Sequence, residues 1–215
     1  MGCTTPGVPK DGDNNAADFR FVNTTGTLTA AGQLLGAPGP EGLTSPVRRD
    51  TTGIGLPLLD ALLPAASAPN RLRTLTDPVY GSPFGTMTIR RRVTNNTGNP
   101  VTQLRFRIIE FTTFPAPAGI ADLRARTGVD EGSISVSDPA TCTASGAGSA
   151  PCIVTVLKTT LDQPPTQSIG GGLNSTMSVT LESPLPNGES VNVSFLLGVH
   201  QPGTFRFLVI VEALP

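Results

Sequence analysis

The residues that could do chemistry are few, and their spacing fits none of the common catalytic sites. His200 is the single histidine of the 215 residues, so a Ser-His-Asp or Cys-His arrangement would have to be built around it, and no Gly-x-Ser-x-Gly motif accompanies it. The acids are scattered, as at Asp130 and Glu131, whereas glycoside hydrolysis needs two carboxyl groups held across a cleft. The sequence therefore predicts a protein that is not an enzyme.

Metal binding has equally little support in the sequence. Only two cysteines lie near each other and no histidine is close to them, which excludes a zinc site of the Cys/His kind. The stretch 11–15 begins like a calcium loop, but Ala16 stands at the position of the loop's glycine and Val22 at that of its bidentate glutamate. We expect no metal and no other cofactor.

Cys142 and Cys152 bracket a small-residue connector, Thr-Ala-Ser-Gly-Ala-Gly-Ser-Ala-Pro. A short disulfide can close such a connector without straining regular structure, so the spacing predicts a bridge and an oxidising compartment. Two buried free thiols are the alternative. Cys3 is left over as a free or intermolecular thiol.

The stretch 84–111 predicts two strands joined by a polar turn at 95–100. Apolar side chains alternate on both sides of the turn, as the period of two in a strand requires. We expect the strands to pair as a hairpin in which Val93 faces Leu104 and Ile89 faces Ile108.

That hairpin would bring four arginines together on its outer face. They are Arg90, Arg92, Arg105 and Arg107. Like charges directly across a strand pair are unfavourable unless something offsets them, so an acidic partner surface, a packed carboxylate or long solvated side chains must explain the group. A solvated face and a contact patch for another molecule are the two interpretations left open. Arg91 has the inward parity and fits neither interpretation unless the strand bulges there.

Composition limits the remaining classes of function. Only 14% of residues are charged and the formal net charge is -1, so no basic field exists that would hold nucleic acid. No run of 18 apolar residues is present, which argues against a membrane-spanning helix. The chain has no Trp and one Tyr, so it lacks the flat aromatic platforms on which sugars stack.

The N-terminal part of the chain, residues 1–83, has a different residue pattern from the rest. Residues 1–16 predict a polar tail, and the following stretch 18–30 alternates with Phe19 and Phe21 on one face, which predicts one strand reaching Leu28. Residues 32–83 carry eight prolines, which exclude long helices and central strands.

Residues 32–83 are therefore predicted to be an arm or linker, in which only 54–63 has the pattern of a turn or two of helix. From Phe84 onward, seven or so strands with turn signals between them predict an all-β fold, an antiparallel immunoglobulin-like β-sandwich over 84–215. Residues 1–83 would form a long irregular N-terminal arm.

Four stretches, 89–107, 161–167, 170–175 and 195–215, resemble β-rich modules at the C-termini of bacterial cell-surface proteins. The likeness covers most of residues 17–215. It implies export, an extracellular or cell-surface location and a structural or adhesive role, and it supplies no catalytic residues.

The leading hypothesis is a structural subunit of a bacterial surface assembly or filament built from copies of itself. The strand that contains Phe19, Phe21 and Leu28 would complete a neighbour's sheet, because strand addition satisfies exposed edge hydrogen bonds. A monomeric adhesin or carbohydrate-binding module is one alternative, and a virion surface protein is another. The start at Met1 shows no signal peptide, so export would require that an upstream leader or a larger polypeptide has been trimmed.

Overall fold

The structure is a computed structural model of residues 1–215 and describes residues 52–77, 79, 81–110, 121–163, 169–172 and 174–214. All of these belong to one compact unit, Asp50–Pro215. The predicted strand with Phe19, Phe21 and Leu28 lies outside the described residues, as does Cys3.

The described residues form short strands and one short helix. In chain order these are β1 (Ile54–Gly55), β2 (Arg71–Thr74), β3 (Thr86–Asn95), β4 (Gln103–Glu110), β5 (Asp122–Arg126), β6 (Glu131–Val136), α2 (Pro139–Ala144), β7 (Cys152–Lys158), β8 (Thr160–Gln163), β9 (Thr176–Val179), β10 (Ser190–Gln201) and β11 (Leu208–Leu214). The predicted all-β class is confirmed.

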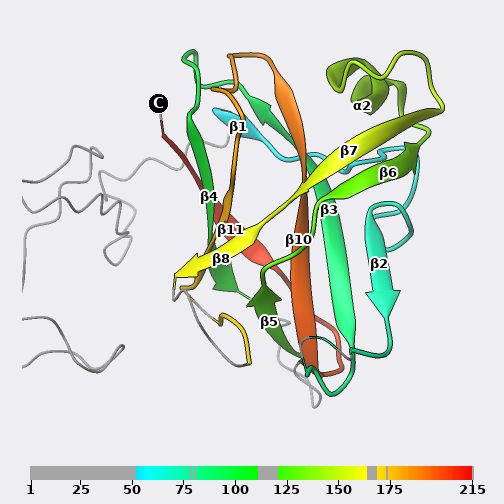
Figure 1. The fold of residues 1–215 in the computed structure, drawn as a ribbon, viewed down its shortest axis with the longest axis vertical. Coiled ribbons are helices and arrows are strands. Elements are labelled where there is room, and N and C mark those ends of the chain that lie inside the picture. The colour runs from blue at the N-terminus through cyan, green and yellow to red at the C-terminus, as the bar shows by residue number, and fades with distance from the viewer. Residues whose placement is uncertain are drawn as a thin grey trace, which may run out of the picture. The chain divides into compact units, whose positions relative to one another are not determined.

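The strands form two sheets that pack as a sandwich (Figure 1). The first sheet has the order β1-β3-β10-β7-β6, with β2 also paired to β3 and β5 to β10, and the second has the order β11-β4-β9-β8. Most neighbours are antiparallel, and β7 runs parallel to β10. In the second sheet β11 and β8 are therefore the edge strands.

The core lies between the two sheets and follows from the alternation of side chains along the central strands. Val93 of β3, Leu104 and Phe106 of β4 and Val193 of β10 are fully buried. The rings of Phe106 and Phe195 meet edge to face across the core, with centroids 4.9 Å apart. Both sheets thus turn an apolar inner face toward the other, which is the condition for a stable sandwich.

The predicted hairpin is wrong in its pairing, although the inward faces of its two strands are right. β3 pairs with β10, so that Ile89 lies opposite Phe195, whereas β4 pairs with β9 and β11 in the other sheet. The turn after β3 carries the chain from one sheet to the other. Side-chain alternation determines which face of each strand is buried. A hairpin within one sheet and two strands in facing sheets bury the same faces, so alternation does not distinguish them.

The sandwich also begins before Phe84, so the predicted boundary is placed too late. β1 and β2, which lie in the stretch predicted to be an arm, both pair antiparallel with β3. Leu59, in the same stretch, is fully buried. Because proline lacks the N–H that a central strand needs, the stretch supplies only short edge strands and turns. No turn of helix forms at 54–63.

The apolar run 153–161 forms parts of two strands in different sheets. The hydroxyl and the backbone N–H of Thr159 both donate to the carbonyl of Ser194, at 2.9 and 3.0 Å. Thr159 thus holds the chain where it leaves β7 in the first sheet and enters β8 in the second.

A second, smaller core contains the predicted disulfide. Cys142 of α2 and Cys152 of β7 are bonded, with Cα atoms 5.8 Å apart. Asp138 caps α2 by accepting from the backbone N–H of Ala140 at 2.9 Å. The bridge packs with Leu59, which ties the segment before β2 to the β6–β7 hairpin.

Replacing both Cys142 and Cys152 by Ala should lower the free energy of unfolding by about 2 to 3 kcal/mol, because the bridge closes a short loop in the unfolded chain. Urea unfolding with and without reductant measures this difference. Cys3→Ser is the matched control and should leave the transition unchanged. Equal stability of oxidised and reduced wild-type protein would contradict the bridge.

Candidate functional site: an edge groove beside β11

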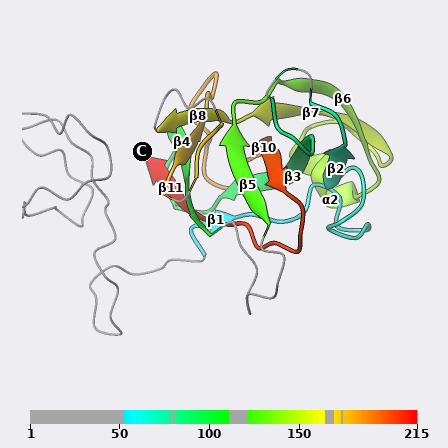
Figure 2. The same ribbon diagram turned by 90° about the horizontal axis from the view of Figure 1, so that it is seen from below.

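The edge strand β11 is the feature with the clearest capacity to bind. It pairs with β4 from Gln103 to Glu110 on one side, and no residue described in the structure pairs with its other side. A strand edge presents a row of backbone N–H and C=O groups that another strand can use. Figure 2 shows β11 and β1 on the same side of the sandwich.

A groove of about 590 Å³ opens between the sheets beside this edge. The first sheet and its loops contribute Leu56, Ile89 and Phe195, and the chain leading into β11 contributes Phe207 and Val209. A groove of this size is within the range of about 300–1,000 Å³ that holds ligands, so several side chains from another segment would fit.

The groove continues into a smaller hollow of about 280 Å³ toward the far end of β3, where Met87 and Leu123 line it. Ala66, Arg71 and Phe205 border both parts. The guanidinium of Arg71 lies over the ring of Phe205, 5.8 Å from its centroid, a favourable cation–π arrangement. The groove is therefore apolar inside with cations at its border.

Arg91 is the exception, because it lies inside the groove. The register between β3 and β10 is regular at this point, with Arg91 opposite Val193, so the strand does not bulge and Arg91 keeps its inward parity. Its Nη1 donates to the carbonyl oxygen of Arg90 at 2.8 Å, and no carboxylate of the described residues pairs with it. Burial lowers the pKa of the Arg91 guanidinium.

The four outward arginines do not form the predicted single patch, since Arg90 and Arg92 belong to the first sheet and the other two to the second. Arg90 donates through Nε to Oε1 of Glu131 at 2.9 Å and through Nη1 to the carbonyl of Pro69 at 2.8 Å. Nη1 of Arg92 donates to the hydroxyl of Thr141 at 3.0 Å. Both side chains are thus engaged within the sandwich.

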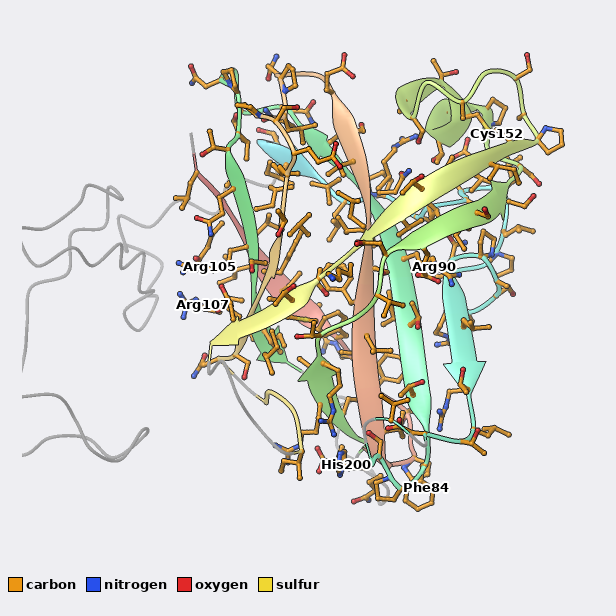
Figure 3. All side chains as sticks on the ribbon, in the orientation of Figure 1. Phe84, Arg90, Arg105, Arg107, Cys152 and His200 are labelled. Carbon is orange, nitrogen blue, oxygen red and sulfur yellow. A yellow bond between two sulfur atoms is a disulfide. The ribbon has the colours of Figure 1, made fainter. Side chains whose placement is uncertain are left out.

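In the second sheet, Arg105 and Arg107 share one carboxylate. Their Nε atoms donate to the two oxygens of Glu212, at 2.6 and 2.9 Å. Figure 3 shows Arg105 and Arg107 at the left edge of the sandwich and Arg90 well to their right. Glu212 lies on β11, directly across from Arg105 in the sheet. This carboxylate offsets the repulsion that suggested a partner surface, and contact with another molecule stays a prediction.

The polar groups that sequence reasoning considered for catalysis do not gather into a site. His200 lies near the end of β10, and its Nε2 has no hydrogen-bond partner among the residues described. In that same part of the chain, no group of three His, Cys, Asp or Glu side chains could hold a metal ion. No helix there is long and apolar enough to cross a membrane.

Comparison with known protein families, with curated proteins and with solved structures finds no match to this chain. The sequence did not predict the groove, because it arises from strand order. Two of its signals were present nonetheless: the inward parity of Arg91, and a row of aromatic side chains, Phe205 and Phe207, that precedes β11.

Glu212→Gln should lower the free energy of unfolding by about 1–3 kcal/mol, because two guanidinium groups, each about one-fifth exposed, lose their shared carboxylate. Urea unfolding measures the change. Asp122→Asn is the control, since Asp122 pairs with Arg124 and is more exposed than Glu212. This substitution should lower the free energy of unfolding by no more than about 1 kcal/mol. Equal losses in the two variants would show that the Glu212 network contributes nothing beyond a surface ion pair.

Proposed function

We propose that this chain is a non-enzymatic structural subunit of an extracellular bacterial surface assembly, in which a strand from the N-terminal segment of one copy is added to the sandwich of the next. The observation that supports this most is the free edge of β11 beside an apolar groove. Edge strands of this kind are templates for further pairing, and proteins usually cover, twist or charge them.

The topology gives the proposal a second argument. In an immunoglobulin-like sandwich the last strand lies at the edge of one sheet, next to the strand before it. If β3 and β10 take the places of strands B and E, and β4 and β11 those of strands C and F, the position of strand G is the one beside β11. No strand described in the structure occupies it. We propose an immunoglobulin-like fold that a strand from another copy completes.

Location outside the cytoplasm is supported by the disulfide between Cys142 and Cys152, because such bonds persist in oxidising compartments. The resemblance of four stretches of the sequence to bacterial surface modules points the same way.

A monomeric binding module is the second candidate, and the arginines of the groove favour it. Arg71 and Arg91 line a space large enough for a small molecule, and guanidinium groups bind carboxylates and phosphates well. On this alternative the groove would hold a free anionic ligand and the N-terminal segment would not be needed.

Removing residues 1–32 discriminates between the two candidates. The truncated chain should lose assembly, as measured by analytical ultracentrifugation and electron microscopy, and should stay folded, because every described core residue follows position 52. Removing only the polar tail, 1–16, is the matched control and should leave assembly intact. Full-length protein that is monomeric at all concentrations would refute the structural proposal.

A further inference from the structure

The groove beside β11 makes two chemical demands on whatever fills it. Its walls, with Ile89, Phe195, Phe207 and Val209, require apolar side chains. Arg91 favours an acceptor, because a guanidinium has five N–H groups and the one hydrogen bond described for it goes to the carbonyl of Arg90. The occupant must therefore present apolar groups and an acceptor on the same face.

These two demands have a fixed order along the groove. On the inner face of β3, Met87, Ile89 and Arg91 follow one another at every second residue. Along this row Met87 and Ile89 are apolar and Arg91 is cationic. Arg73 and Arg71 lie opposite Met87 and Ile89 on β2, so cations also border the apolar levels. Successive positions on this row are separated by about 6.6 Å, which is two strand residues.

The stretch 18–30 of the sequence carries a matching row. Residues on one face of a strand alternate, so Phe19, Phe21 and Asn23 would share a face of the predicted strand. Two aromatic side chains are followed by an amide whose Oδ1 is an acceptor for a guanidinium. A strand laid in the same direction as β3 would bring Phe19 and Phe21 to the levels of Met87 and Ile89 and Asn23 to the level of Arg91.

Resting on the function proposed above, we propose that the groove is the acceptor site for residues 18–30 of a second copy. The added strand pairs with the free edge of β11, Phe19 and Phe21 fill the groove, and the side-chain oxygen of Asn23 accepts from Arg91. The 21 residues from 31 to 51 span up to about 70 Å when extended, so a neighbouring copy is well within reach.

A crosslinking experiment with two differently tagged full-length chains tests this assignment. One chain carries a benzoylphenylalanine photo-crosslinker at Phe21, and its control carries it at Val22, on the opposite face of the predicted strand. After mixing and irradiation, Phe21 should crosslink to residues 203–209 of the chain with the other tag, and Val22 should not. Neither substitution alters the folded sandwich.

The outcomes separate this inference from the proposed function. Assembly without crosslinks to the groove would overturn the acceptor site and leave the structural role standing. Crosslinks within one chain would overturn the second copy as the occupant. Absence of assembly altogether would overturn the function and, with it, this inference.

A double-mutant cycle tests the contact between Asn23 and Arg91. Asn23→Ala and Arg91→Met should each weaken assembly about tenfold, and the double variant should be no weaker than either single one. Thr24→Ala and Arg124→Met are the matched controls and should leave the assembly constant unchanged. Additive losses from Asn23→Ala and Arg91→Met would show that the two side chains do not meet.

Discussion

The structure depends on one constraint, that the apolar inner faces of both sheets must be covered along their whole width. Through most of the sandwich each sheet covers the other, which is why Val93, Leu104, Phe106 and Val193 have no exposed surface. Beside β11 the two sheets no longer cover each other completely. There Leu56 and Val209 are only partly buried, and they line a groove instead of a closed core. Apolar surface in contact with water is unfavourable, and another strand would cover it.

The distribution of arginines follows the same division. On the outer faces Arg90, Arg105 and Arg107 are paired with carboxylates of their own chain, and Arg92 reaches a hydroxyl. Those surfaces need no partner to be stable. Arg91 is different, because it lies between the sheets and burial disfavours its charge. Arg91 has no carboxylate partner among the described residues, and it lies where backbone pairing is also incomplete.

The sequence predicted the strands well where alternation is long and regular. β3 and β4 have the predicted inner faces, because burial of one face constrains every second residue. The short edge strands β1 and β2 were missed, because two to four residues between prolines are too few to show an alternation of apolar and polar side chains.

Strand partners could not be predicted, since side-chain alternation does not determine which sheet a strand joins. The split at Thr159 shows why: one apolar run serves two sheets, and a pair of hydrogen bonds to Ser194 determines where it divides. The groove depends on this strand order and was equally hidden. The parity of Arg91 was a local sign of it, because an inward arginine on a central strand conflicts with a closed core.

Hydrogen exchange at the backbone amides of β11 measures the central claim most directly, since it reports whether the free edge of the sheet acquires a partner. In the full chain, protection of Leu208–Leu214 should rise with protein concentration, and in a chain that lacks residues 1–32 it should stay low at every concentration. Identical protection in the two chains, independent of concentration, would contradict strand addition at this edge.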